Sequence, residues 1–124
     1  MSPRASATAH ELARVTLLAG LPGETLVRLA KQMTREEVAP GATVVAEGEP
    51  GDRFYVVLSG MMTVSQADFG GRGVLRPGDY FGEVALAMGI PRTASVRALT
   101  PATVASCDKA TFDELLRPLF ADDD

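Results

Sequence analysis

Hydrophobic residues recur at helical spacing near the start of the chain, and this pattern predicts two helices. The first covers residues 9–18 and can end at Gly20, and its apolar face holds Leu12, Val15 and Leu18. The second follows a Leu-Pro-Gly turn and covers residues 24–33, and its apolar face holds Leu26, Leu29, Ala30 and Met33.

From residue 40 onward the pattern changes to short β-branched or aromatic runs that glycines separate. These runs are residues 43–46, 54–58, 61–65, 93–99 and 102–107. Short strands with turn residues at nearly regular spacing are typical of an all-β sandwich or barrel. Because residues 54–58 lack polar alternation, we expect them to form a central strand that is covered on both faces.

A closing helix is predicted from residue 109 to about residue 117, with Asp108 as its N-cap and Pro118 as its limit. Its apolar face holds Phe112, Leu115 and Leu116. The expected fold is mainly β: a β-roll or jelly roll of about eight short antiparallel strands, with flanking N- and C-terminal helices and one short helix inside the roll. We expect one domain over residues 1–124, with flexible ends at residues 1–8 and 118–124.

The charge and the composition exclude several partners. The chain has 124 residues and a formal net charge of −4, so no general basic field attracts nucleic acid, and we expect no direct nucleic-acid binding. No apolar run approaches the roughly 18 residues of a membrane span, and the first twenty residues lack the apolar core of a secretion signal. We therefore expect a cytoplasmic soluble protein, or a soluble piece of a larger one. A homo-oligomer is compatible with the sequence.

The chain has one histidine and one cysteine, and this count argues against metal sites and hydrolytic triads. We interpret His10 as a surface residue of the N-terminal helix, and Cys107 has no partner for an intrachain disulfide. A cupin-like β-barrel usually needs a histidine-rich metal site, so that class is disfavoured. We expect no metal, no cofactor, no catalytic residue and no enzymatic activity.

One stretch carries candidate chemistry: FGEVALAMGIPRTASV, residues 81–96, where Glu83 and Arg92 stand among apolar or small residues. Residues 82–88 read as a short helix whose first amides lack intrahelical partners and favour an anion. Arg92 follows a proline turn, and its planar guanidinium suits two phosphate oxygens. A carboxylate beside a phosphate is repulsive, so Glu83 makes sense as an acceptor from a hydroxyl. A phosphate next to a hydroxyl describes the sugar-phosphate of a nucleotide.

This stretch resembles the phosphate-binding cassette of the cyclic nucleotide-binding domain family. That family includes the regulatory subunits of cyclic AMP-dependent protein kinase, the catabolite activator protein and cyclic nucleotide-gated channels. The pattern F-G-E-x-A-L followed by P-R-x-A-x-V is matched within residues 81–96. Residues 47–52 and 54–60 resemble the family's G-x-x-G-D turn and the strand after it, and residues 76–80 resemble its lead-in to the cassette. The likeness covers about residues 12–117.

The resemblance implies a sensor module that binds a cyclic nucleotide and passes a change of conformation to an effector outside this sequence. Arg92 would hold the exocyclic oxygens of the cyclic phosphate, and Glu83 would accept the ribose 2′-hydroxyl. The other expected ligand-binding residues are Phe81, Gly82, Val84, Ala85, Thr93 and Ala94. Cyclic AMP is the expected ligand, and cyclic GMP is a second one because the Thr93 hydroxyl can bond the guanine 2-amino group. Leu86 would pack toward Phe112 or Leu116 as the mechanical link.

Two alternatives stay open at this point. Glu83 and Arg92 could pair with each other in a structural salt bridge, or the domain could keep the fold and act as a ligand-free protein-interaction domain.

The family often closes the base end of the pocket with a further C-terminal helix, but few residues follow Pro118. The lid would then lie beyond this chain or come from another chain, or the base would stay partly open. The remaining arginines and methionines are read as solvated residues (Arg72, Arg76, Arg97) and as gap-filling core (Met61, Met62, Met88), and Tyr80 as a packing residue.

Overall fold

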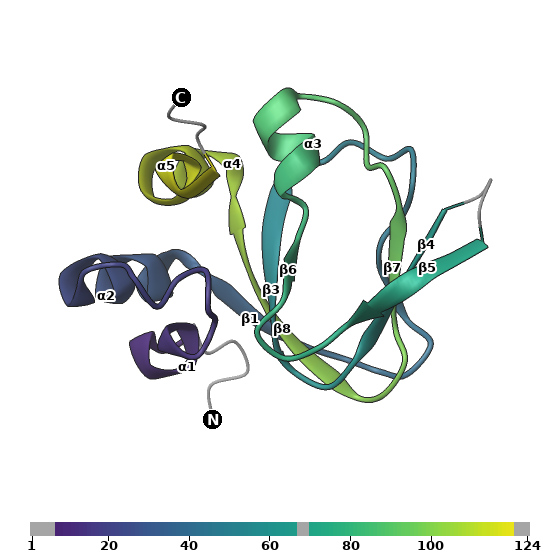
Figure 1. Ribbon diagram of the computed structural model, residues 1–124, viewed down its shortest axis with the longest axis horizontal. Helices are drawn as coiled ribbons and strands as arrows, with labels where there is room; N and C mark the ends of the chain where they lie inside the picture. The colour runs from purple at the N-terminus through teal and green to yellow at the C-terminus, as the bar shows by residue number, and fades with distance from the viewer. Residues whose placement is uncertain (1–6, 67–69, 121–124) are drawn as a thin grey trace.

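The computed structural model describes residues 7–66 and 70–120, and in it two antiparallel four-stranded sheets face each other to form a roll (Figure 1). The first sheet has the order β1-β8-β3-β6, with β1 at Thr34–Val38, β8 at Ala102–Asp108, β3 at Arg53–Ser59 and β6 at Tyr80–Phe81. The second has the order β2-β7-β4-β5, with β2 at Thr43–Val45, β7 at Ser95–Ala98, β4 at Met62–Gln66 and β5 at Gly70–Leu75. These eight strands confirm the predicted β-roll.

The helices of both chain ends gather on the outer face of the first sheet, whereas the short helix α3 lies at one end of the roll (Figure 1). Helix α3 spans Glu83–Met88 and connects β6 of the first sheet to β7 of the second. The N-terminal helices are α1 (Ala9–Ala13) and α2 (Gly23–Gln32). The C-terminal helical stretch consists of α4 (Lys109–Thr111), the π-helical segment η1 (Phe112–Leu116) and α5 (Arg117–Phe120).

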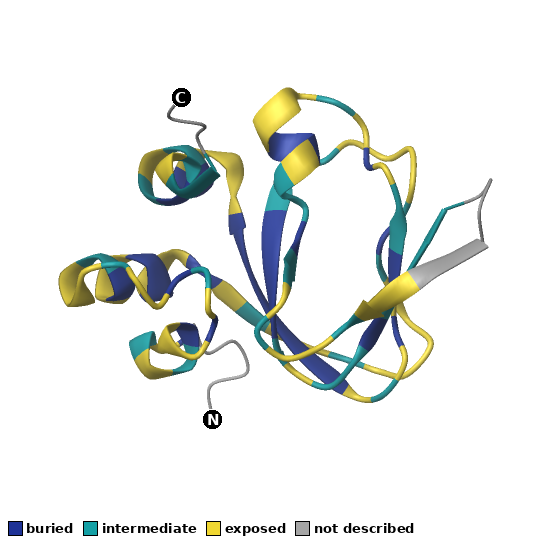
Figure 2. Ribbon diagram, in the orientation of Figure 1, coloured by how far each residue is buried: buried dark blue, intermediate teal, exposed yellow. Residues whose placement is uncertain are grey.

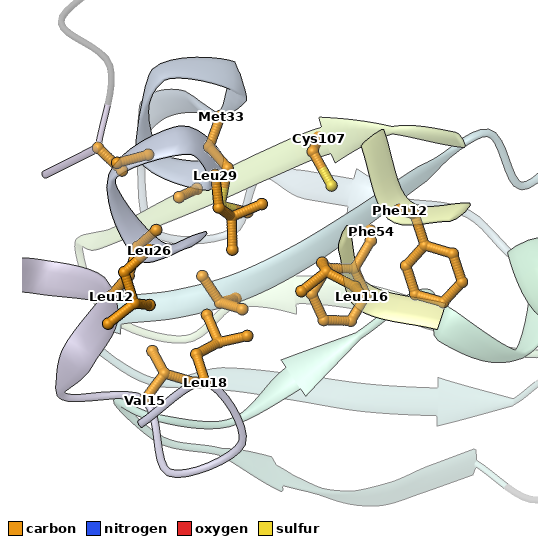
Figure 3. Packing of buried hydrophobic residues seen from close by; sticks show 14 of the residues in the cluster. Leu12, Val15, Leu18, Leu26, Leu29, Met33, Phe54, Cys107, Phe112 and Leu116 are labelled. Atoms are coloured by element: carbon orange, nitrogen blue, oxygen red, sulfur yellow. The ribbon is translucent and has the colours of Figure 1, made fainter. Parts of the chain in front are cut away.

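Strand β3 separates two hydrophobic cores, because its side chains alternate between them. Phe54 and Val56 face the helices, where they join a cluster that includes Leu12, Leu18, Leu29, Met33, Cys107, Phe112 and Leu116 (Figure 3). Tyr55 and Val57 face the inside of the roll with Val45, Met62, Phe81, Val96, Ala98 and Val104. Strand β3 therefore lies between buried layers, as Figure 2 shows by its colour, and the prediction of a central strand covered on both faces is confirmed.

The first helix is shorter than predicted. It ends at Ala13, and residues 14–20 form turns instead of completing a helix to residue 18. Backbone amides in these turns bond three residues back: Val15 to Leu12, and Leu18 to Val15. The three-residue spacing of the apolar residues therefore buries the same side chains in a tighter turn geometry, which the sequence pattern does not distinguish from an α-helix.

The last helix is longer than predicted. We expected it to end before Pro118, but the helical stretch continues to Phe120. In the π-helical segment the Arg117 amide donates to the Phe112 carbonyl, so the α-helical register is already broken just before the proline. Pro118 thus falls near the start of α5, where a missing N–H is tolerated. The predicted N-cap is confirmed, because the Asp108 side chain accepts from the Thr111 amide at 2.9 Å.

Parts of the two ends that we expect to be flexible lie in helices or in packed contacts. Ala7 is buried, and Thr8 caps α1 through a capping box with Glu11. Leu119 and Phe120 pack against the helical core. Residues 7, 8 and 118–120 thus lie in packed or hydrogen-bonded positions, whereas residues 1–6 and 121–124 lie outside the described part of the chain.

Candidate functional site

A cavity of about 180 Å³ opens beside α3, and all eight predicted site residues line it: Phe81, Gly82, Glu83, Val84, Ala85, Arg92, Thr93 and Ala94. The cavity has five further lining residues that the sequence did not single out: Val45, Val64, Leu75, Tyr80 and Val96. These come from strands β2, β4, β5, β6 and β7, and four of them are aliphatic. The cassette thus forms one wall, and apolar side chains of the roll form the rest.

Arg92 is the one charged residue in the buried set of the described chain, with 6% of its surface exposed. Its Nη2 donates to the Arg53 carbonyl at 3.0 Å, and its Nη1 donates to the Gly82 carbonyl at 3.5 Å. The guanidinium also lies 5.7 Å from the centroid of the Tyr55 ring, which stacks in turn on Phe81. A guanidinium has five N–H groups. Among the described residues two of them have partners, which leaves three without a protein acceptor.

Two glycines let the chain pass close to Arg92. Gly82 has φ +98°, and a Cβ placed there would lie 2.7 Å from the Arg53 carbonyl oxygen and 2.8 Å from Arg92 Nη1. A Cβ on Gly51 would lie 2.2 Å from Ala85 Cβ and 3.4 Å from Arg92 Nε. Both positions therefore need glycine, Gly82 for its backbone conformation as well as for space and Gly51 for space alone.

The turn at residues 47–52 fixes the backbone around Arg92. The Gly48 amide donates to the Arg92 carbonyl at 2.9 Å, and the Arg92 amide donates to the Glu49 carbonyl at 2.8 Å. Three residues further on, the Ser95 hydroxyl accepts from the Glu47 amide at 2.9 Å. This turn therefore acts as a scaffold that holds the segment carrying Arg92 against the end of the roll.

Glu83 is half-buried at the first position of α3. Burial raises the pKa of its carboxyl above the ordinary value of 4.5, and a hydrogen bond from its own backbone amide partly opposes that rise. No ion pair joins Glu83 to Arg92 within the described residues, so the salt-bridge alternative has no support in the structure. A hydroxyl group that donates a hydrogen bond to such a desolvated carboxylate stabilises its charged form.

The remaining predicted residues lie around the mouth of the cavity. Thr93 and Val84 are exposed, and Ala94 is half-buried. The Thr93 carbonyl accepts from Gln66 Nε2 at 2.8 Å, which ties this edge of the cavity to β4. Met88, expected in the core, is instead 68% exposed on α3. The prediction for Met88 was wrong, because a six-residue helix whose residues after Glu83 are all apolar gives no periodic signal for the face that is buried.

The described residues contain no group of three or more histidine, cysteine, aspartate or glutamate side chains that could hold a metal ion. Among the same residues, no helix is long and apolar enough to cross a membrane. Burial raises the pKa of the Cys107 thiol to about 12, so this side chain stays protonated in the helical core.

The sequence pattern of the cyclic nucleotide-binding domain family matches residues 35–118, which include the whole cavity wall formed by the cassette. The chain belongs to this family. The domain is 42% identical over 109 residues to a cAMP-dependent protein kinase regulatory subunit of Yarrowia lipolytica, and 40% identical over 104 residues to one of Debaryomyces hansenii. These matches cover 87% and 84% of this chain but 29% and 23% of the two subunits, so the chain spans about a quarter of these relatives.

Solved structures agree with this domain over most of its length. A structure of cAMP-bound PfPKA-R superposes with a TM-score of 0.85 at 29% identity, over 90% of this chain and 39% of the other. The regulatory domain of Toxoplasma gondii PKA with cAMP gives the same TM-score and identity, over 90% and 44%. The regulatory subunit of a cAMP-independent protein kinase A from Trypanosoma brucei also reaches 0.85, at 26% identity over 89% and 40%. The fold is therefore shared by relatives that differ in their response to cAMP.

Proposed function

We propose that this domain binds cyclic AMP in the cavity beside α3 and works as a regulatory sensor. The observation that carries the proposal is Arg92, a buried arginine on a cavity wall with three N–H groups free of the described protein atoms. A buried arginine in this position suits an anion, and a bidentate contact to two phosphate oxygens would use two of its three remaining donors. The two fungal relatives and the two cAMP-bound neighbours support cyclic AMP as that anion.

The residues around Arg92 have complementary roles in this proposal. The first amides of α3 face the phosphate, and Gly82 and Ala85 leave room for its close approach. Glu83 accepts the ribose 2′-hydroxyl, which suits a half-buried carboxyl without an ion-pair partner among the described residues. Val84 and Thr93 contact the sugar and the base. Phe81, Ala94 and the aliphatic strand residues form the wall beneath them.

The output of this sensor would pass through the C-terminal helices. Leu86 of α3 belongs to the same buried cluster as Phe112 and Leu116 of η1, so a shift of α3 on binding changes the packing of η1. The ligand then favours one of two arrangements of these helices. The module would regulate and not catalyse, and its effector would be another domain or a partner protein in the cytoplasm.

Calorimetric titration with cyclic AMP tests the proposal, with Arg92→Ala as the central variant. Hydrogen bonds to charged groups contribute about 1.5–3 kcal/mol, so this substitution should weaken binding by about 10- to 150-fold. Arg92→Lys should recover only part of the loss, because a point charge does not reproduce the planar fork. Arg97→Ala is the matched control, since Arg97 is exposed on β7 and outside the cavity lining. Normal binding by Arg92→Ala would show that the phosphate is held elsewhere.

A second candidate, a nucleoside site, follows from one relative: a cAMP-independent regulatory subunit of Trypanosoma cruzi is bound to guanosine, with a TM-score of 0.80 at 28% identity. The same titration with guanosine and adenosine distinguishes the two. A cyclic nucleotide site should bind cyclic AMP more tightly than adenosine, and Arg92→Ala should reduce that difference. No binding of any of these compounds would leave the ligand-free interaction domain as the better account.

A further inference from the structure

We propose that Arg53 is a positioning residue that sets the direction of the Arg92 guanidinium. The effect of Arg53 on ligand binding rests on the proposed function, whereas the contacts that orient Arg92 are present in the protein without a ligand. Arg53 contacts two different neighbours through its two ends. Its carbonyl oxygen accepts from Arg92 Nη2 at 3.0 Å, while its side chain donates to Ser106 of β8, with Nε to Oγ at 3.0 Å and Nη2 to the carbonyl oxygen at 3.1 Å.

The place of Arg53 in the sheet explains why its backbone needs this support. It is the first residue of β3, and its pairing with Asp108 is the last pair of the β3–β8 ladder. Strand ends open more readily than strand centres, because fewer hydrogen bonds and packed neighbours hold them. Ser106 is 4% exposed within β8, so the two bonds from the Arg53 side chain anchor the strand end to a buried part of the sheet.

The Arg53 carbonyl is the closer of the two acceptors that orient Arg92. The Gly82 carbonyl lies 3.5 Å from Nη1, near the outer limit for a hydrogen bond. The Arg53 carbonyl also lies against Gly82, since a Cβ there would come within 2.7 Å of it. Strand β3, Gly82 and the guanidinium thus meet at one point. A displaced Arg53 carbonyl would therefore turn Arg92 away from the cavity or press on the residue that precedes α3.

The side chain of Arg53 is not itself a ligand contact in this account. It is absent from the cavity lining, and its guanidinium points to Ser106 on β8. Its influence on the ligand passes through its carbonyl and Arg92. Arg53→Lys keeps the positive charge but loses the two-point contact with Ser106, whereas Ser106→Ala keeps Arg53 and removes the hydroxyl acceptor. The two variants weaken the same anchor from opposite sides.

Cyclic AMP titration of both variants gives the first test. Substitutions within such networks change coupling by amounts that correspond to about a 2- to 30-fold change in affinity, and we expect a loss in this range. In an Arg92→Ala background, the same substitutions should cause no further loss. Arg97→Lys is the matched control, because Arg97 is exposed on a strand outside this network. This variant should bind as the unaltered protein does. Equal losses with and without Arg92 would overturn the positioning role.

The second test needs no ligand and therefore separates this inference from the proposed function. In a ¹H–¹⁵N spectrum of the free protein, the Nε–Hε signal of Arg92 can be assigned by its absence from Arg92→Lys. We expect Arg53→Lys and Ser106→Ala to move this signal, and Arg97→Lys to leave it in place. An unmoved signal in both folded variants would overturn the inference. If the unaltered protein binds no cyclic nucleotide but the signal moves, the proposed function fails and the positioning role holds.

Discussion

The close contact between the residue 47–52 turn and α3 predicts that Gly51→Ala destabilises the domain. The added Cβ would lie 2.2 Å from Ala85 Cβ. Because apolar carbon atoms prefer a separation of about 3.5–4.0 Å, the turn and the helix must separate by about 1.3–1.8 Å. Ala85 is 3% exposed and is fixed in α3, so neither side can yield by a change of rotamer. Overpacking of this kind costs about 1–3 kcal/mol, and we expect the free energy of unfolding to fall by that amount.

Urea unfolding measures this loss, and two further variants isolate its cause. Gly20→Ala is the matched control, because a Cβ there meets nothing within 4 Å and no positive φ requires glycine. Ala85→Gly removes the opposing methyl group at a cost of about 1 kcal/mol in helix propensity. If the clash is the cause, Gly51→Ala combined with Ala85→Gly should be about as stable as Ala85→Gly alone. Additive losses in the double variant would refute the steric reasoning, since contacting residues should couple.

Three other predictions follow from the site and from the cap of the last helix. Burial raises the pKa of Glu83, so the folded state holds that proton more tightly than the unfolded chain does. The free energy of unfolding should therefore fall as the pH rises from 4.5 through the folded pKa. Glu83→Gln should lack this fall when urea unfolding is measured at each pH, and an unchanged pH slope in this variant would contradict the assignment. Thr93→Ala should lower the affinity for cyclic GMP relative to cyclic AMP by about 2- to 12-fold, the value of one hydrogen bond, and an unchanged affinity ratio would remove Thr93 from base selection. Asp108→Ala should lower the free energy of unfolding by about 0.5–2 kcal/mol through loss of the N-cap, whereas Asp108→Asn should retain most of it; equal losses would show that the cap bond contributes little.

The order of the elements affects how a ligand signal could leave the cavity. Arg92 reaches the C-terminal helices by two routes that diverge at α3 and β3. One passes through Leu86 to the cluster around Phe112, and the other passes through Arg53 and Ser106 to the end of β8, where Asp108 caps α4. Arg53→Lys and Ser106→Ala act on the second route and leave the contacts of the first unchanged, whereas Gly51→Ala presses on α3 in the first.

The sequence by itself determined the features that depend on neighbours along the chain. The cassette could be read because Glu83, the start of α3 and Arg92 all lie within sixteen residues, so their relation is local. The same is true of Asp108, whose side chain caps the amide three residues later. The buried face of α2 was predictable because an amphipathic helix repeats its apolar residues at a fixed period, and Leu26, Leu29 and Ala30 are buried as expected.

Some strands were beyond the reach of periodicity. Strand β1 has the sequence Thr-Arg-Glu-Glu-Val, and its charges suit an edge strand that pairs only with β8. The same charges leave it without the apolar pattern that identifies a strand. Strand β6 has two residues, too few to show alternation, and its place follows from pairing with β3. Strand β5 contains three glycines, which the sequence alone indicates as turn residues. Its strand conformation follows from pairing with β4.

Only the tertiary structure decided which distant residues meet at the site. Gly51 lies against Ala85, and Arg53 bonds to Arg92, although 34 and 39 residues separate them along the chain. The aliphatic wall of the cavity likewise collects one residue from each of several strands, and none of these stands out in its own segment. Local patterns fix how a segment folds and which chemistry it carries. The direction in which Arg92 points depends on contacts that form only when β3, β8 and α3 come together, because its partners are backbone carbonyls that any sequence would supply.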